Sequence, residues 1–266
     1  MTQSVVILIN GNCKPVVSVI MPAYNAEKTV EASINSVKAQ TYSNWELIIL
    51  DDASQDTTLQ IVKSAAQGDA RIHVVINEHN MGVAATRNAG IAQAKGQWIA
   101  FLDSDDLWRE DKLEKQLRFA KENDAAITYT ATSYMDSSGN IFNYVLPAEF
   151  KFTYKVLMHR NIMSCSSVIV MRDVMMPFPQ GFIHEDYAVW LQIVRKTECA
   201  YGLDEPLLIY RMGEATRSSG RLKSAQMIWG TYREVGYGRV SATFYTLRYA
   251  MHSIVKRARI QSGCRQ

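Results

Sequence analysis

The chain has little cysteine and no long apolar run. Its 266 residues include four cysteines without any C-x-x-C spacing, at Cys13, Cys165, Cys199 and Cys264. Their scatter suggests neither a zinc site nor a disulfide framework and favours a reducing compartment. No stretch approaches the ~18 apolar residues of a membrane-spanning helix, and the opening segment lacks the basic start of a signal peptide. We therefore expect a cytoplasmic protein.

Two glycine-rich phosphate-binding motifs are also missing. Neither G-x-x-x-x-G-K-[ST] nor G-x-G-x-x-G occurs in the chain, which counts against P-loop and dinucleotide-binding folds. The composition is otherwise that of an ordinary globular protein, with 47% hydrophobic and 21% charged residues.

Charge is divided unevenly along the chain. Residues 211–266 hold 11 lysines and arginines against Glu214 and Glu234, which leaves 24 acidic and 18 basic groups in the first 210 residues. A basic tail on an acidic body suggests a separate anionic partner. On the basis of charge alone, the partner could be either a membrane surface or a nucleic acid. The amphipathic pattern of the tail favours the membrane, and we expect no nucleic-acid partner.

Strand and helix patterns alternate over the first half of the chain. Short, mostly β-branched stretches predict buried strands at Val16–Met21, Trp45–Leu50, Ile72–Ile76, Gln97–Leu102 and Ala125–Thr130. Apolar residues at helical spacing predict intervening helices over 30–37 (with Asn25 as N-cap), 59–66, 82–94 and 113–120. This alternation predicts an α/β fold with a doubly wound, mostly parallel sheet.

The regular alternation ends after residue 131. Later elements are predicted as a turn at Asp136–Asn140, a strand at Ser166–Met171, a helix at Glu185–Lys196 and a strand at Pro206–Tyr210. From about Leu222 the chain is predicted to be helical, with an interruption near Gly236 and Gly238.

The most informative motif is Asp103-Ser104-Asp105-Asp106, which directly follows a predicted strand. Carboxylates crowded at a strand end repel one another, and a cation between them would keep them ionised. In extended backbone Asp103 and Asp105 project to the same side, which makes a pair of oxygen ligands suited to Mg²⁺ or Mn²⁺. The alternative is an acidic turn in which Asp106 caps a following helix.

Three further polar groups follow strands or open helices. The Tyr24 ring could stack on a nucleobase, although such a tyrosine more often packs under its loop. Asp52 could accept a hydrogen bond from a base or ribose, and the alternative is an Asx turn with Asp56 as the N-cap of the next helix. The Arg87 guanidinium could bind diphosphate or anchor the acidic loop, with a solvated surface position as the alternative.

The chain resembles an inverting glycosyltransferase of family 2, with the GT-A fold. The motifs that carry the resemblance are V-S-V-I-M-P-A-Y-N, L-D-D-A-S-Q-D, N-x-G-x-x-x-x-R-N-x-G and F-L-D-S-D-D, followed by G-F-I-H-E-D-Y-A-V-W. The resemblance covers roughly residues 16–211. It implies a metal-dependent enzyme of bacterial surface-polysaccharide synthesis.

The resemblance also assigns roles to individual residues. It places these residues around the donor nucleotide: Pro22, Ala23, Tyr24, Glu27 (as a buttress), Asp52, Arg87, Asp103 and Ser104. Asp105 would ligate Mn²⁺ or Mg²⁺ on the diphosphate. Asp186 matches the catalytic base, with Glu185 and Trp190 on the acceptor side. The alternative for Asp186 is a carboxylate that caps a helix.

One position departs from the family pattern. Many relatives carry a histidine two residues after the position of Arg211, but Gly213 stands there in this chain. Contacts from the following serine-rich loop to the donor phosphates are therefore in doubt, although Arg217 could replace the histidine.

The basic tail has an apolar stripe at helical spacing, which comprises Phe244, Leu247, Met251, Ile254, Val255 and Ala258. Arg248, His252, Lys256 and Arg259 lie beside it, with Tyr245 and Tyr249 interleaved. This is the pattern of a helix on an anionic membrane. Packing onto the catalytic domain or onto a second copy in a homodimer explains the stripe equally well.

These features predict a GT-A catalytic domain over 1–221, with a nucleotide-binding half at about 16–130 and an acceptor-side half at about 131–221. A basic amphipathic tail follows at 222–266. The expected reaction moves a sugar from a UDP-sugar to a hydroxyl of a saccharide or lipid-linked oligosaccharide, at the inner face of the cell membrane. The alternatives are a sugar nucleotidyltransferase and a non-catalytic sugar-nucleotide-binding scaffold.

Overall fold

A computed structural model describes residues 15–212 and 221–263, without the side chains of residue 221 and residues 255–263. The predicted roles of Gly213 and Arg217, and of the basic side chains beyond Ile254, lie outside the described residues. No helix among the residues described is both long and apolar enough to cross a membrane.

One half of the central sheet is parallel. Its four strands stand in the order β3-β2-β1-β4, with bounds Ile72–Ile76 (β3), Trp45–Asp51 (β2), Val17–Ala23 (β1) and Trp98–Phe101 (β4). All three neighbouring pairs in this set are parallel. The four predicted strands are confirmed. The inner strands β2, β1 and β4 are almost wholly buried and carry continuous apolar runs, whereas the edge strand β3 is only partly buried.

The other half of the sheet is mixed. After β4 the order continues β9-β6-β10-β5, with bounds Ile169–Met171 (β9), Ile127–Met135 (β6), Cys199–Arg211 (β10) and Leu107–Trp108 (β5). β9 is antiparallel to both its neighbours, whereas β6 and β10 are parallel. Two further strands, Ile141–Leu146 (β7) and Lys151–Thr153 (β8), pair with β6 and β10. The prediction of a mostly parallel, doubly wound sheet is confirmed.

The described chain forms α-helices with the following bounds: Val30–Lys38 (α1), Thr58–Ala66 (α2), Val83–Gln93 (α3), Lys112–Glu122 (α4), Tyr154–Leu157 (α5), Glu185–Thr197 (α6), Arg221–Glu234 (α7) and Arg239–Gly263 (α8). Short 3-10 turns occupy Cys165–Ser167 and Arg172–Val174. The predicted N-cap of α1 is wrong, because Thr29 holds that position. Asn25 instead has a φ of 48° and accepts a hydrogen bond from Gln55 N through its Oδ1.

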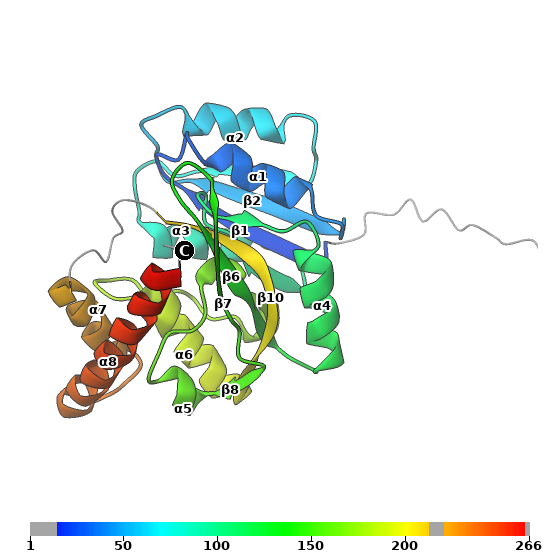
Figure 1. The fold of residues 1–266 in the computed structure, drawn as a ribbon. Helices are drawn as coiled ribbons and strands as arrows, with labels where there is room; N and C mark the ends of the chain where they lie inside the picture. Colours follow the sequence, from blue (N-terminus) through cyan, green and yellow to red (C-terminus); the bar gives the residue numbers. More distant parts are fainter. Residues whose placement is uncertain (1–14, 213–220, 264–266) are drawn as a thin grey trace, which may run out of the picture.

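Each face of the sheet carries its own apolar core. Side chains alternate along a strand, so that Val19 of β1 faces one core and Ile20 faces the other. The first core contains buried residues of α1, α2 and α4. The second contains residues of α3 and α6. Figure 1 shows these helices arranged around the sheet.

Helices α7 and α8 form a pair beside α6 (Figure 1). Tyr232 of α7 is fully buried, and its hydroxyl donates a 2.6 Å hydrogen bond to Met158 O. Ala242 of α8 is also fully buried, and the Tyr249 ring lies 5.4 Å from the Tyr187 ring. One face of the predicted tail therefore packs on the α/β body, while the division at residue 221 stays a prediction.

Candidate active site

A cleft of about 790 Å³ lies at the carboxyl ends of the parallel strands. This is the edge at which open α/β sheets bind ligands. Its walls include nearly all the predicted donor-side residues, namely Pro22, Ala23, Tyr24, Asp52, Arg87, Asp103, Ser104 and Asp105, together with Glu185. The fold thus brings together groups from loops that are far apart in sequence.

The Tyr24 ring stands at the rim of this cleft. It is 48% exposed, so the alternative of a ring packed under its loop is wrong. An exposed aromatic ring beside backbone amides provides a surface on which a planar base can stack.

Asp52 holds the loop that opens α3. Its Oδ1 accepts hydrogen bonds from Met81 N at 2.9 Å and from Asn77 Nδ2 at 2.8 Å, and its Oδ2 accepts one from Gly82 N at 2.9 Å. Burial disfavours the ionised carboxyl, but these hydrogen bonds outweigh it and lower the pKa of Asp52. The alternative Asx turn also exists, because Asp56 Oδ1 accepts from Thr58 N at 2.9 Å, but the predicted N-cap is wrong, because Thr57 holds that position. Asp52 is thus a fixed anion in the cleft wall.

Glu27 lies outside the cleft. Its Oε2 accepts hydrogen bonds from Thr57 N at 3.1 Å and from the Thr57 hydroxyl at 2.7 Å. Its own amide donates to Asp56 Oδ2 at 3.2 Å. These bonds tie the loop after β1 to the start of α2, so Glu27 supports the loop that carries Tyr24.

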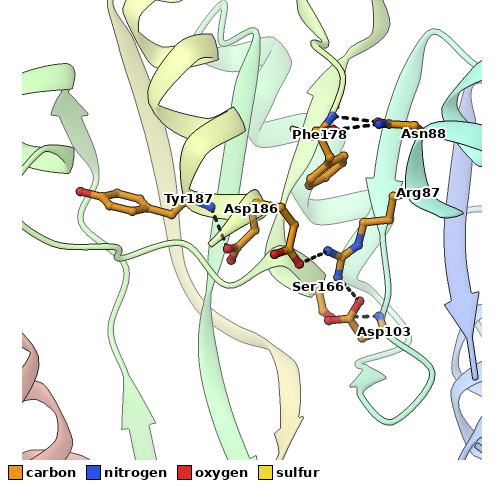
Figure 2. Close-up of polar contacts among 8 residues, drawn as sticks. Arg87, Asn88, Asp103, Ser166, Phe178, Asp186 and Tyr187 are labelled. Carbon is orange, nitrogen blue, oxygen red and sulfur yellow. Dashed lines mark hydrogen bonds and ion pairs between the residues drawn. The ribbon is translucent and has the colours of Figure 1, made fainter. Parts of the chain in front are cut away.

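Arg87 is buried beneath the cleft and joins two acidic groups. Its Nη2 lies 2.6 Å from Asp103 Oδ1 (Figure 2), and its Nη1 lies 3.3 Å from Glu185 Oε1. Although burial opposes the charge, the two carboxylates hold the pKa of Arg87 above its usual range. The alternative of a solvated surface arginine is wrong, because only 4% of the residue is exposed.

The acidic loop is a tight turn rather than extended backbone. Asp106 N donates a 3.1 Å hydrogen bond to Asp103 O, and Asp103 and Asp105 both line the cleft. Asp106 is no helix cap, because β5 follows it and its buried Oδ1 accepts from Arg211 N at 3.0 Å. Burial, and then the charges of Asp105 and Asp103, raises the pKa of Asp106 well above its usual range.

The Asp105 side chain reaches solvent, but its surroundings disfavour the ionised carboxylate. Desolvation by the surrounding protein and repulsion from Asp103 raise the pKa of Asp105 to about 6. A divalent cation would reverse this effect. Among the described residues no group of three histidine, cysteine or acidic side chains is placed to hold a metal. The two carboxylates fit an ion whose other ligands are phosphate oxygens and water, as Mg²⁺ and Mn²⁺ commonly bind.

Asp186 lies in the first turn of α6, next to Glu185. Its Oδ1 accepts a 2.7 Å hydrogen bond from Tyr187 N. Figure 2 shows Asp186 apart from the Arg87–Asp103 pair. This local contact is not a helix cap, because His184 holds the N-cap position of α6, and Asp186 does not line the donor cleft.

Trp190, which the resemblance places on the acceptor side, is too deeply buried to contact an acceptor directly. Trp190 is fully buried, and its ring lies 5.8 Å from both the Phe101 and Phe178 rings. The cause is the continuous burial of α6 from Tyr187 to Leu191. Trp190 therefore anchors α6 against the sheet and supports Asp186 only through the position of the helix.

Among the cleft residues that the sequence interpretation missed are Tyr210 and Arg211. Arg211 Nε donates a 3.0 Å hydrogen bond to Asp105 O, and its Nη1 lies 3.4 Å from Asp136 O. The sequence gives little indication of this role for Arg211. Its contacts with the acidic loop and with Asp136 join residues more than 70 positions apart in the chain.

Comparisons with known proteins agree with this geometry. The profile of the family described as Glycosyl transferase family 2 matches residues 18–175. The chain is 38% identical to the putative teichuronic acid biosynthesis glycosyltransferase TuaG of Bacillus subtilis, over 92% of this chain and 99% of that protein. It is 35% identical to the UDP-Glc:alpha-D-GlcNAc-diphosphoundecaprenol beta-1,3-glucosyltransferase WfgD of Escherichia coli, over 91% of this chain and 95% of that protein.

Solved structures share the fold. TarS of S. aureus in complex with UDP-GlcNAc superposes with a TM-score of 0.69 at 20% identity, covering 88% of this chain and 71% of that one. The mannosyltransferase PcManGT of Pyrobaculum calidifontis, in complex with GDP-Man and Mn²⁺, superposes with a TM-score of 0.66 at 17% identity. The match covers 93% of this chain and 76% of that one. The predicted GT-A architecture is confirmed. With the family match over most of the α/β body, the chain belongs to glycosyl transferase family 2.

Proposed function

We propose that this glycosyltransferase moves a sugar from a UDP-sugar to a hydroxyl of a lipid-linked saccharide, with inversion at the anomeric carbon, in surface-polysaccharide synthesis. The observation that carries the proposal is the meeting of the Asp103–Asp105 pair with the exposed Tyr24 ring in one cleft. WfgD and TuaG support the acceptor class and the pathway, and TarS supports a uridine nucleotide.

Different residues of the cleft would bind different parts of the donor. Tyr24 would stack on the base, and the loop held by Asp52 would form the wall beside it. Asp105, with Asp103 beside it, would hold Mn²⁺ or Mg²⁺. The ion, when bound, stabilises the negative charge that develops on the departing diphosphate. Arg87 keeps Asp103 in place from below, at 2.6 Å.

Asp186 is proposed as the general base. In one displacement the acceptor hydroxyl gives its proton to the Asp186 carboxylate, and its oxygen forms a bond to the anomeric carbon. The bond from that carbon to the phosphate oxygen breaks, and UDP leaves with the electron pair. Attack opposite the leaving group inverts the anomeric centre. A carboxylate positioned for this transfer commonly contributes ~10²–10⁴-fold in rate.

We further propose that the outer face of α8 lies on an anionic membrane. The stripe residues Phe244, Leu247, Met251 and Ile254 are 54–64% exposed, so this stripe does not pack on the catalytic domain. Residues 239–263 contain arginine and lysine but no acidic residue. Exposed apolar side chains beside cationic ones are typical of helices that lie in the membrane interface.

Neither alternative activity is favoured by the cleft. A sugar nucleotidyltransferase would need a glycine-rich basic loop for a triphosphate, and the loop after β1, residues 22–27, has neither glycine nor a cationic side chain. A non-catalytic scaffold would have no use for both the Asp103–Asp105 pair and Asp186.

The deciding experiment is a UDP-release assay. The full chain is incubated with UDP-glucose, UDP-galactose, UDP-GlcNAc or UDP-GalNAc, with a short-chain alkyl α-GlcNAc diphosphate as acceptor, with and without Mn²⁺. We expect acceptor-dependent release with one donor above the others, and loss of release with a chelator. Tight binding of UDP without release from any donor would favour the scaffold.

A further inference from the structure

A second groove, of about 390 Å³, lies between β7, the segment around residues 146–162 and α8. Its size falls within the ~300–1,000 Å³ range of small-molecule sites. Tyrosines 129, 144 and 249 line it, together with Arg160, Glu149 and His252. This groove is separate from the cleft described above, and none of its lining residues was predicted as a site.

The lining of the groove matches the chemistry of a sugar. A pyranose ring has apolar C–H faces, which stack on aromatic rings, and hydroxyl groups around its edge, which need donors and acceptors. The groove offers tyrosine rings beside an Arg160–Glu149 ion pair of 2.5 Å. Both partners of this pair are about 40% exposed, so their remaining hydrogen-bonding groups are accessible.

Contacts between tyrosine rings link the groove to the donor cleft. Tyr144 in the groove lies 5.9 Å from Tyr134, and Tyr134 lies 5.8 Å from Tyr210. Tyr210 lines the donor cleft. One buried ring, that of Tyr134, thus contacts a residue of the groove on one side and a residue of the cleft on the other.

A second contact links the groove to the proposed base. Tyr249 lines the groove, and its ring lies 5.4 Å from Tyr187, the residue that follows Asp186. The groove also lies beside the exposed stripe of α8, since His252 and Met251 are adjacent on that helix. It therefore stands near the donor, the base and the proposed membrane face together.

We propose that this groove binds a saccharide unit of the acceptor, away from the hydroxyl that reacts. The inference rests on the proposed sugar transfer and names a binding site for its second substrate. The Tyr144 ring would carry the stacking contact, and the Arg160–Glu149 pair would bind sugar hydroxyls.

The test uses three variants of the full chain. Tyr144→Ala removes the ring, Tyr144→Phe keeps it, and Val145→Ala is the matched control on the same strand, since successive side chains point to opposite faces. The acceptor probe is a short-chain alkyl diphosphate that carries a GlcNAc-containing disaccharide, so that one sugar can react while the other occupies the groove, and the second probe is the same alkyl diphosphate without sugar. Acceptor KM, kcat and the calorimetric Kd of each probe are measured with UDP and Mn²⁺ present.

We expect Tyr144→Ala to raise the KM and Kd for the sugar-bearing probe about tenfold, the effect of losing one well-placed contact. Tyr144→Phe and Val145→Ala should stay within twofold of wild type, and the KM for UDP-sugar should not change. Equal loss for the probe without sugar would assign the groove to the alkyl chain and overturn the proposal. Unchanged acceptor KM in Tyr144→Ala would also overturn it, while wild-type UDP release would leave the proposed function standing.

Discussion

Arg87 and Asp103 meet at 2.6 Å beneath the donor cleft, although they come from α3 and from the loop after β4. The same guanidinium lies 3.3 Å from Glu185 at the start of α6. One buried side chain thus joins the loop that would hold the diphosphate to the helix that carries the proposed base.

Replacing Arg87 should destabilise the protein. Arg87→Met would leave two carboxylates without their buried partner, and removal of one partner from such a pair costs ~3–5 kcal/mol. The free energy of unfolding in urea measures this loss. Arg118→Met is the control, because its pair with Glu122 is exposed on both sides and such pairs contribute at most ~1 kcal/mol. A loss for Arg87→Met no larger than the control would contradict the bridging role.

Replacing Asp105 should separate metal binding from stability. Asp105→Asn removes an anionic ligand, so the enhancement of UDP affinity by Mn²⁺ should disappear in calorimetry. Because burial and Asp103 raise the pKa of Asp105 to about 6, loss of this charge should leave the melting temperature equal or higher. The control is Asp111→Asn, which lies on the surface and pairs with Lys115. Unchanged Mn²⁺ dependence in Asp105→Asn would remove Asp105 from the metal site.

Replacing Asp186 should affect chemistry alone. Asp186→Asn keeps an oxygen for the Tyr187 amide, so folding should persist. It removes the proton acceptor, so transfer should fall by ~10²–10⁴-fold, while UDP affinity with Mn²⁺ should stay the same. Near wild-type transfer, or joint loss of UDP binding and stability, would leave Asp186 with a purely structural role in the first turn of α6.

Buried Lys112 should make stability depend on pH. Its ammonium group lies 2.7 Å from Gln116 Oε1, and burial lowers the pKa of Lys112 to about 7. In the unfolded chain the pKa is ~10.4, so between these values unfolding takes up a proton and stability rises with pH, by up to ~1.4 kcal/mol per unit. The cost of burial is therefore complete below pH 7 and is relieved toward pH 10.

The variant Lys112→Met isolates this effect. It cannot titrate, so its stability relative to wild type should be most favourable at pH 7 and should decline as the pH rises to 10. Chemical denaturation of both proteins across this range gives the difference. A difference that does not change with pH would show that Lys112 keeps an ordinary pKa.

The stripe of α8 should carry membrane binding. Leu247→Glu places a charge on a residue that is 64% exposed, so the fold should be kept while flotation with anionic liposomes falls several-fold. Ile76→Glu is the control, since it makes the same charge change at a 48% exposed apolar residue on β3. Unchanged flotation, together with conversion of a wild-type dimer to a monomer, would assign the stripe to a second copy of the chain.

The sequence predicted the elements whose pattern is local. Strands β1 to β4 were found because each is a short apolar run, and the cleft residues were found because they directly follow such strands. The strand β9 was predicted within Ser166–Met171, but its antiparallel direction was not, since the direction depends on the irregular path after residue 131. The tight turn from Asp103 to Asp106 had been the alternative to an extended backbone, but β5 follows it in place of the helix that Asp106 was expected to cap.

Residues with long-range partners were the hardest to assign. Trp190 was placed near the acceptor, but α6 is buried over most of its surface and its pattern does not show which face meets the cleft. Arg211 was missed because its partners Asp105 and Asp136 lie 106 and 75 residues away. Arg87 was assigned correctly to the acidic loop as one of its options, although its second partner, Glu185, was not foreseen.

The two faces of α8 have a practical consequence for anyone who purifies this protein. Deleting the hydrophobic tail is a common way to obtain better-behaved material, but here the same helix contributes Ala242 and Tyr249 to the interior. A chain shortened at α8 would lose these buried contacts together with the exposed apolar face of the helix. Solubility should instead be improved by single polar replacements on the outer face, which leave the inner face in place.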